Sequence, residues 1–374
     1  MRIERVTLKN FKRFESITIE LKNAATGDIA SQFLIVGDNG TGKTTVLQAI
    51  ALCLSFLSHR IRYVEELDWM GWMPGRYWRW GRPQIELVVH FSDEEIAATQ
   101  EAARRWREVF RPDRFVEPAH ENVVRAGLDG DRYWVVDPDK EFDPPGPPEL
   151  FLFQGRSYAS SILNRDPAAR DLFERLPGVF WFDQFRNLAT SPGSREVETE
   201  NGPREESSEQ VAYAVGVARL RQYLNRWKLQ RLQGVQPGRV DFLLELENNY
   251  KRIFQERSFT DPEPMYRGGV PSPSDYYFML SDGNRTYDLE EMSSGEQSVF
   301  PLLYEFVRQR IRHSVVLIDE IDLNLHPPLA QSLLASLPRL GPECQFIYTT
   351  HSRAVSELVS PHEIKRLEGG RTCL

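Results

Sequence analysis

One stretch of nine residues, Gly37-Asp38-Asn39-Gly40-Thr41-Gly42-Lys43-Thr44-Thr45, constrains this chain more than any other. It fits the P-loop pattern of Gly, four residues, and then Gly-Lys-Thr. The apolar run 33–36 before it is typical of a buried strand, and residues 46–52 after it have the apolar spacing of a helix. Because strand, glycine-rich turn and helix are the context that this motif requires, the sequence predicts a nucleotide-binding site.

The chemistry of the P-loop assigns expected roles to its residues. Backbone N–H groups of a glycine-rich turn can surround an anion, and the helix N-terminus adds a partial positive charge. We expect Lys43 to reach the β- and γ-phosphates of ATP, and the Thr44 hydroxyl to ligate Mg²⁺. The other expected nucleotide-binding positions are Gly37, Asn39, Gly40, Gly42 and Thr45.

The composition is that of a soluble globular protein, with 374 residues of which 41% are hydrophobic and 27% charged. A net charge of −8 gives no overall attraction to nucleic acid, so any such contact needs a local patch. Cys53, Cys344 and Cys373 lack metal or disulfide spacing, which suits the reducing cytoplasm. Since no apolar run approaches about 18 residues and no signal peptide is evident, we expect no membrane association.

The N-terminal residues 2–21 alternate between apolar and polar as strands do, around the turn Asn10-Phe11-Lys12-Arg13-Phe14. Two strands joined by a basic, aromatic turn predict an antiparallel ribbon ahead of the P-loop strand. Lys12 and Arg13 would then lie near the nucleotide. The alternative is a solvated hairpin tip, which charge alone does not exclude.

Residues 60–82 interleave basic and aromatic side chains: Arg60, Arg62, Trp69, Trp72, Arg76, Tyr77, Trp78, Arg79, Trp80 and Arg82. Such a segment can hold phosphates and stack on bases. It can equally meet a protein partner, because Trp and Arg are enriched at interface hot spots, or simply pack on a sheet. All three interpretations stay open.

The middle of the chain predicts an insertion between two halves of an ATPase. We expect an N-terminal ATPase lobe over 1–92, a mostly helical insertion over 93–275, and a C-terminal ATPase lobe over 276–374. The expected elements are strands at 83–91, 133–136, 151–155, 179–185, 276–280 and 286–289, helices at 92–110, 209–232 and 240–256, and a polar loop at 190–208. Two of these strands carry glutamines, Gln154 and Gln184, and the turn 234–238 joins the last two helices into a hairpin.

The C-terminal third carries further catalytic candidates. The apolar strand 315–318 ends in Asp319-Glu320, which is the Walker B arrangement. Asp319 would hold Mg²⁺ through water, and Glu320 would polarise the attacking water. A later strand, 346–348, leads to His351, which could donate a hydrogen bond to the γ-phosphate.

As a set, these motifs resemble a known family. The turn 10–14, the P-loop, Ser293-Ser294-Gly295-Glu296-Gln297, the segment 318–327 that ends in Leu-His-Pro, and Thr349-Thr350-His351-Ser352 occur in order. Together they resemble the ABC-type ATPase heads of the RecF, SMC and OLD (overcoming lysogenization defect) group, most closely its OLD-like branch. The resemblance covers roughly 1–55 and 275–360. It implies an α/β fold of the P-loop NTPase class, with a mixed sheet, flanking helices and an N-terminal antiparallel β ribbon.

The resemblance also implies how the site works. Ser293, Ser294 and Gly295 match the signature motif, although Met292 and Ser294 depart from the family's common Leu-Ser-Gly-Gly. In this family the signature binds the γ-phosphate of ATP held by the other subunit, so catalysis implies a head-to-head homodimer, or a higher homo-oligomer, around ATP and Mg²⁺. Asp322 matches the D-loop, which crosses that interface. For the Q-loop residue that contacts Mg²⁺, Gln154 is the first choice and Gln184 the second.

Three functions are compatible with this resemblance. The first is a slow ATPase (ATP + H2O to ADP + phosphate) that regulates a separate effector, a nuclease or toxin, in bacterial anti-phage defence; the chain up to Leu374 leaves no room for the Toprim nuclease domain of OLD nucleases. The second is a RecF-like DNA repair or recombination ATPase that binds DNA directly. A transporter ATPase subunit fits less well, because the turn 10–14 and Glu296 resemble SMC heads.

Overall fold

The computed structural model describes residues 1–139, 146–184, 208–232, 234, 240–265 and 275–368. The predicted polar loop 190–208 and hairpin turn 234–238 lie almost wholly outside these residues. The chain divides into two compact units, each described here by itself. Unit 1 comprises 1–184, 310–321 and 337–374, and unit 2 comprises 185–309 and 322–336.

An antiparallel sheet opens unit 1, with the strand order β2-β1-β4-β5-β6. Its strands are β1 (Arg2–Phe11), β2 (Phe14–Glu20), β4 (Gln84–His90), β5 (Val123–Asp129) and β6 (Arg132–Val135). The alternating residues of β1 bury Ile3, Val6 and Leu8 on one face, as the period of two requires. The expected N-terminal ribbon is therefore present, and β4 extends it on the other side of β1.

A parallel sheet forms the second layer of unit 1, with the order β15-β3-β14-β13-β7. Its strands are β3 (Gln32–Val36), β7 (Val179–Phe182), β13 (Val315–Ile318), β14 (Gln345–Thr350) and β15 (Ile364–Arg366). Every neighbouring pair is parallel. The P-loop, Asp319 and His351 follow β3, β13 and β14, so all three lie at the carboxyl edge of this sheet.

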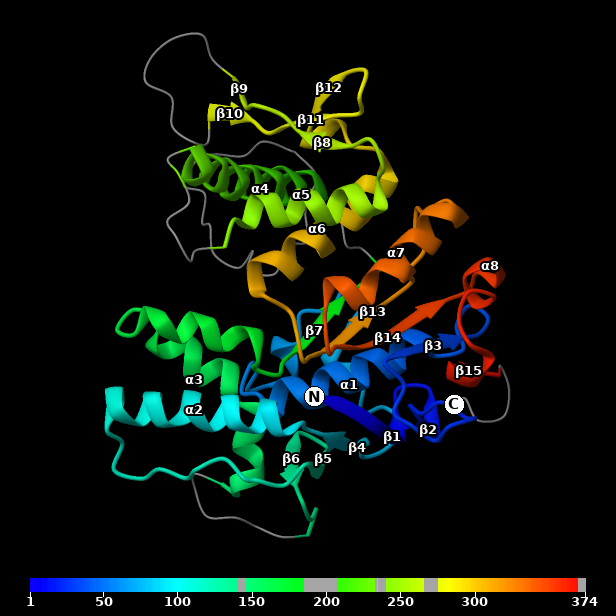
Figure 1. Cartoon of the computed structure of the whole chain (residues 1–374). Helices are drawn as coiled ribbons and strands as arrows, with labels where there is room; N and C mark the ends of the chain where they lie inside the picture. Colours follow the sequence, from blue (N-terminus) through cyan, green and yellow to red (C-terminus); the bar gives the residue numbers. More distant parts are fainter. Residues whose placement is uncertain (140–145, 185–207, 233, 235–239, 266–274, 369–374) are drawn as a thin grey trace. The chain divides into compact units, whose positions relative to one another are not determined.

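The P-loop helix α1 (Lys43–Leu57) packs between the two sheets (Figure 1). All of its residues except Thr44 are buried, and it shares one apolar cluster with strands of both sheets. A helix that is apolar all round is stable only when it is covered on every side. The two sheets supply this cover and thereby fix the first turn of α1 at the P-loop.

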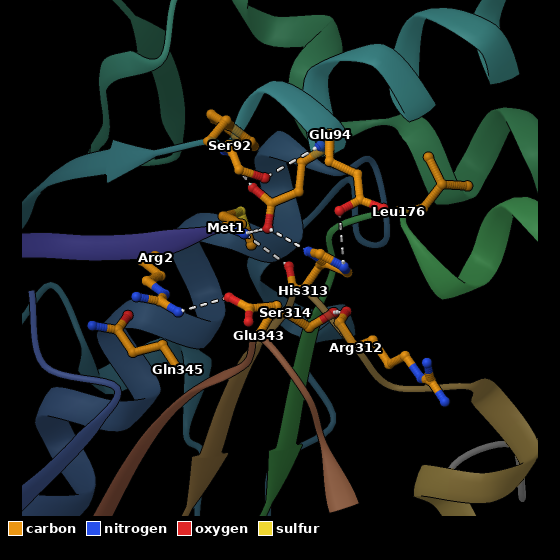
Figure 2. Close-up of polar contacts among 12 residues, drawn as sticks. Met1, Arg2, Ser92, Glu94, Leu176, Arg312, His313, Ser314, Glu343 and Gln345 are labelled. Atoms are coloured by element: carbon orange, nitrogen blue, oxygen red, sulfur yellow. Dashed lines mark hydrogen bonds and ion pairs between the residues drawn. The ribbon is translucent and has the colours of Figure 1, made fainter. Parts of the chain in front are cut away.

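Polar contacts near the start of β1 join the two layers of unit 1. Gln345 accepts a hydrogen bond from Ile3 N at 2.7 Å and donates to Ile3 O at 2.9 Å. Arg2 pairs with Glu343 at 3.1 Å (Figure 2). The buried amine of Met1 forms an ion pair with Glu95 and donates to the His313 carbonyl at 2.8 Å. These contacts hold the start of β1 against β14 and the residues before β13.

Two helices, α2 (Asp93–Phe110) and α3 (Gly155–Ile162), pack together beside the antiparallel sheet. Ser92 and Glu95 form the capping box that starts α2 where the sequence predicts it. The strand expected at 151–155 is wrong, because its apolar residues 151–153 lie in a 3-10 helix, Pro148–Phe153, and α3 begins at Gly155. Proline suits the first turn of a helix, and all four apolar residues from Leu150 are buried without any strand pairing.

Unit 2 combines helices with short antiparallel strands. It contains α4 (Ser208–Leu232), α5 (Phe242–Ile253), α6 (Ser294–Gln309), β8 (Ser258–Phe259), β9 (Glu263–Pro264), β10 (Tyr276–Tyr277), β11 (Met279–Ser281), β12 (Thr286–Asp288) and the greater part of α7 (Pro327–Leu340). Within it, α5 contacts both α4 and α6 (Figure 1). Buried Arg221 of α4 pairs with Asp288 at 2.5 Å, ahead of the signature segment.

The boundaries of the two units differ from the three segments expected from the sequence. Strands β5, β6 and β7 fall within the expected insertion, yet they pair with β4 and β13 and belong to unit 1. The short helix α8 (Arg353–Ser356) also belongs to unit 1. In the part of the chain that the structure describes, no helix combines the length and the apolar character that crossing a membrane needs.

Candidate nucleotide-binding site

The P-loop wraps closely around its own backbone at the start of α1. Gly40 and Gly42 have φ angles of 79° and 100°, a left-handed region that favours glycine. A Cβ on Gly42 would lie 2.4 Å from Phe14 Cζ, and one on Gly37 would lie 2.7 Å from the Leu367 carbonyl oxygen. Both glycines therefore permit a close approach that a side chain would block.

The ammonium group of Lys43 closes the loop from inside. Its Nζ donates to the carbonyls of Gly37 and Asp38 at 2.8 and 3.1 Å. Only 6% of Lys43 is exposed, whereas Asn39 and Gly40 are exposed at the loop surface and Thr45 is buried. The lysine thus lies where it could exchange these carbonyls for phosphate oxygens.

A chain of hydroxyl and carboxylate groups joins the P-loop to β13 and β14. Thr44 Oγ1 donates to Asp319 Oδ2 at 2.8 Å, and Thr349 Oγ1 donates to Asp319 Oδ1 at 2.6 Å. Asp319 is fully buried. Hydroxyl and carboxylate oxygens are the ligands that Mg²⁺ prefers. The oxygens of Thr44 and Asp319 therefore fit the expected magnesium site, where the ion would neutralise charge on the transferred phosphoryl group.

Glu320 and His351 lie at the same edge. His351 Nδ1 is 3.9 Å from Glu320 Oε1, and the two side chains are 54% and 21% exposed, respectively. The Glu320 N–H donates to Thr349 Oγ1 at 2.8 Å, and Glu320 has a φ of 45°. This bend turns the chain directly after β13 and leaves the carboxylate partly open to solvent, as a base that acts on water requires.

The turn between β1 and β2 lies against the P-loop. Besides Phe14, the Cδ of Arg13 would lie 2.7 Å from a Cβ at Gly42. Lys12 instead donates to Gln48 of α1 at 2.7 Å. Burial lowers the pKa of Lys12 to about 8, so its charge is more easily lost than that of an ordinary lysine.

The two glutamines considered for the Q-loop lie in different surroundings. Gln154 is 6% exposed and starts α3, and its Nε2 is 3.3 Å from His59 Nε2. Gln184 follows β7, the parallel neighbour of β13, so it leaves the sheet at the same edge as Asp319. The strand that favoured Gln154 in the sequence is absent, and position now favours Gln184.

The signature segment belongs to unit 2, where it starts α6. Ser293 Oγ donates to Glu296 Oε2 at 2.7 Å, and the Glu296 N–H returns a bond to Ser293 Oγ at 3.3 Å. The other carboxylate oxygen accepts from Tyr250 and Tyr287 at 2.5 and 2.6 Å, and from Arg257 at 3.2 Å. This buried carboxylate fixes Ser293 at the N-terminus of a sixteen-residue helix, a position that favours anions.

The pKa of Glu296 is set by opposing effects. Burial, the largest single influence, raises it, but the hydrogen bonds from Tyr250, Tyr287 and Ser293 together lower it below its ordinary value. The carboxylate therefore stays ionised at neutral pH. The ionised carboxylate accepts all of these hydrogen bonds at once and thereby keeps Ser293 in place.

The segment that carries Asp322 lies beside the signature within unit 2. A Cβ on Gly295 would be 3.2 Å from the Asn324 carbonyl oxygen and 3.4 Å from Leu329. Asp322 accepts a bond from Leu325 N at 3.0 Å in the turn before α7. Glycine at position 295 thus allows the expected D-loop to approach the signature helix closely.

Glu296 and Thr349 belong to these networks, yet the sequence motifs assign a role to neither. Ser293 and Glu296 have the spacing of a capping box, so this signal was present. Thr349, which bonds both Asp319 and Glu320, carries no such pattern. Its role depends on the pairing of β14 with β13, which a local motif does not specify.

Comparison with known proteins agrees with this geometry. Residues 33–357 match a family model described as "AAA domain, putative AbiEii toxin, Type IV TA system", and residues 1–64 match a second AAA domain model. The chain is 21% identical over 421 aligned positions to "Retron Vc95 probable ATPase" of Vibrio cholerae serotype O1 biovar El Tor, covering 98% of this chain and 73% of that protein. It is 22% identical to "Retron Ec83 probable ATPase" of Escherichia coli, covering 99% and 72%, respectively.

Among solved structures, an SMC head bound to the C-terminal winged-helix domain of ScpA matches 96% of this chain and 93% of its own, with 14% identity and a TM-score of 0.47. The prediction of an ATPase is confirmed by the family matches and the retron relatives, whose AAA-type domain is consistent with an ABC-type head of the RecF, SMC and OLD group. The first family model spans most of the chain, including the P-loop after β3 and Asp319 after β13. This chain therefore belongs to the AAA-domain ATPase family described as "AAA domain, putative AbiEii toxin, Type IV TA system".

Proposed function

We propose that this chain is an ATP-driven switch. Two copies dimerise head to head around two ATP molecules, and the ATP-bound dimer regulates a separate effector, a nuclease or toxin, in bacterial defence against phage. The observation that carries the proposal is the bonded set Thr44, Asp319, Thr349 and Glu320, because it assembles the groups for Mg²⁺-dependent hydrolysis beside the P-loop.

Each residue of the switch has a proposed role. The P-loop residues and Lys43 hold the phosphates, and Thr44 and Asp319 hold Mg²⁺. Glu320 polarises the attacking water, and His351 contacts the γ-phosphate. We assign the Q-loop to Gln184, since it follows β7 beside Asp319, and we assign Arg13 to the rim of the phosphate site because it touches Gly42.

The proposed dimer depends on the signature segment. Ser293 is held by Glu296 at the start of α6, with the N–H groups of a helix terminus next to it. In the dimer, this helix end faces the γ-phosphate bound by the other copy, and Asp322 lies beside it. ATP then adds charge that both copies together neutralise, so nucleotide occupancy becomes free energy of association.

Mixing two inactive variants tests whether the site is shared. Lys43→Ala removes the phosphate lysine, and Ser293→Arg disrupts the signature, so each variant alone should lack hydrolysis. A mixed dimer of the two has one site with both an intact Lys43 and an intact Ser293, and hydrolysis should reappear on mixing. Persistent inactivity of the mixture would contradict a site built from two copies. Gln230→Arg, on the exposed surface of α4, controls for the added arginine.

The role in defence rests on the relatives. The family description names a toxin of a type IV TA system, and two relatives are retron ATPases. Two bacterial strains are compared, one with the natural locus and one with the same locus carrying Lys43→Ala. The efficiency of phage plating should be reduced on the wild-type strain and not on the Lys43→Ala strain. Equal plating on both strains would contradict the proposed role while leaving the ATPase intact.

A further inference from the structure

An exposed surface of unit 1 lies outside the nucleotide site and is called here the Trp–Arg surface. It consists of Met70, Met73, Arg76, Trp78, Arg79, Trp80 and Arg82, between α1 and β4. We propose that the Trp–Arg surface binds single-stranded nucleic acid, RNA or DNA, by stacking bases on Trp78 and Trp80 and by pairing phosphates with Arg76 and Arg79. This inference does not rest on the proposed ATP-dependent dimer.

Packing explains only part of this segment. Trp69 and Tyr77 are 3% and 2% exposed and belong to the main apolar cluster of unit 1. Trp78 and Trp80, by contrast, are 43% and 45% exposed. Leaving two tryptophans half open to water forgoes apolar burial, so the plain packing interpretation fails for these rings.

The Trp78 ring packs on a fixed base. Tyr77 donates to the Gly130 carbonyl at 3.2 Å and lies 5.7 Å from Trp78, measured between ring centroids. Trp78 also lies against Gly130, where a Cβ would be 2.5 Å from the ring. Arg82 pairs with Asp129 of β5 at 2.7 Å. A base of this kind holds an aromatic ring ready for stacking and lowers the entropy lost on binding.

Charge on the Trp–Arg surface favours an anionic ligand. Residues 69–82 contain three arginines and no acidic residue, in a chain whose net charge is −8. The Arg79 guanidinium lies 5.0 Å from the Trp80 ring centroid. Within the described residues, no carboxylate forms an ion pair with Arg76 or Arg79. These two cations are therefore available to phosphates, as the backbone of a nucleic acid requires.

The alternation of ring and cation distinguishes the ligand. Single strands bind on aromatic platforms flanked by positive charge, because each base offers a face and each nucleotide a phosphate. A duplex hides its base faces, so it could use the arginines and not the tryptophans. Protein interfaces also use Trp and Arg, but the order of ring, cation and ring in Trp78, Arg79 and Trp80 matches the repeat of base and phosphate along a single strand. A single strand accordingly fits better than a duplex or a protein.

The inner side of the segment rests on the turn that flanks the P-loop. Phe11 stacks on Trp72 with ring centroids 6.1 Å apart, and the Lys12 ammonium lies 5.0 Å from the Trp72 ring centroid. The same turn supplies Arg13 and Phe14, which pack at Gly42. One β turn thus separates the Trp–Arg surface from the nucleotide site.

Fluorescence anisotropy with the full chain tests the proposal. Labelled oligo(dT), oligo(U) and a duplex of equal length are titrated without ATP, at several salt concentrations. Either single strand should bind saturably and more tightly than the duplex, and comparison of oligo(dT) with oligo(U) separates DNA from RNA. Trp78→Ala and Trp80→Ala should each weaken binding about tenfold. Arg79→Glu should also weaken it and flatten the salt dependence.

Matched variants control for fold and charge. Phe110→Ala removes an exposed ring from the end of α2, and Arg170→Glu makes the same charge change on another exposed part of unit 1; both should bind like the wild type. All variants should keep the wild-type unfolding temperature and basal hydrolysis. Failure of the wild type to bind either single strand would overturn the proposal and point to a protein partner instead. Wild-type affinity in Trp78→Ala and Trp80→Ala would overturn it as well.

Discussion

The hydroxyl of Thr44 donates a 2.8 Å hydrogen bond to Asp319 Oδ2, which joins the first turn of α1 to the end of β13. These residues are 275 positions apart in the sequence, and the parallel pairing of β3, β14 and β13 brings them to one edge of the sheet. The strand order of unit 1 thereby assembles the proposed magnesium site.

Asp319→Asn tests this relationship. Loss of the buried negative charge should weaken Mg²⁺ binding and lower the rate of ATP hydrolysis by about 100-fold or more, because the metal stabilises charge on the transferred phosphoryl group. ATP binding measured in EDTA should remain close to wild type, since Lys43 and the P-loop are unchanged. Undiminished Mg²⁺-dependent hydrolysis would remove Asp319 from the site.

Gly42→Ala should abolish tight ATP binding. The backbone at φ 100° disfavours alanine by about 1 kcal/mol, and the added Cβ would collide with Phe14 and Arg13. Gly27→Ala is the matched control, because Gly27 also has a positive φ, of 78°, and nothing lies within 4 Å of its added Cβ. Isothermal titration with ATP separates the collision of the added Cβ from the backbone strain, which both variants share. Equal ATP affinities in the two variants would contradict the close contact at Gly42.

Gln184→Ala should lower the rate of ATP hydrolysis without changing the unfolding temperature. Gln184 follows β7 at the edge of the sheet where Asp319 lies, and its side chain is only half-buried. Gln154→Ala should instead cost about 1 kcal/mol of stability, since it removes a buried amide that contacts His59. Steady-state hydrolysis and thermal unfolding of both variants check this. Reduced hydrolysis only in Gln154→Ala would restore Gln154 as the Q-loop residue.

Glu296→Gln should destabilise the protein by about 3 kcal/mol at neutral pH, because it removes a buried carboxylate that accepts from Tyr250, Tyr287, Arg257 and Ser293. The pKa of Glu296 is lowered in the folded state, so its contribution is complete above its unfolded pKa and disappears as pH falls through the folded pKa. The difference between wild type and Glu296→Gln should accordingly narrow below about pH 4.

Denaturant unfolding at pH 7 and under acid conditions checks this prediction. Tyr250→Phe keeps the carboxylate and should cost only about 1 kcal/mol. Glu357→Gln, which alters a 66% exposed carboxylate, should have little effect. A pH-independent gap for Glu296→Gln would show that its charge does not stabilise the signature network.

Local patterns predicted most elements and the chemistry of their ends. The alternation in β1, the capping box of α2 and the apolar run of β13 each follow from their own residues. The apolar run at 151–153 does not distinguish a strand from the 3-10 helix that it forms, because burial in either element requires the same residue types.

Long-range pairing was beyond reach of the sequence motifs. Strands β4, β5 and β6 extend the N-terminal ribbon, and this pairing places them in unit 1. The pairing of β7 with β13 places Gln184, and not Gln154, at the end of a strand next to Asp319. Likewise, Tyr250 reaches Glu296 across 46 positions. Such contacts depend on how whole elements pack, and a local pattern does not encode that.

The most direct test of the central claim is the mass of Glu320→Gln by light scattering, with and without ATP and Mg²⁺. Without its water-polarising carboxylate the variant should bind ATP and not hydrolyse it. We expect twice the monomer mass, or a higher multiple, with ATP and Mg²⁺, and a return to the nucleotide-free mass when Ser293→Arg is added. A Glu320→Gln protein that binds ATP and keeps its nucleotide-free monomer mass would contradict the ATP-bound dimer.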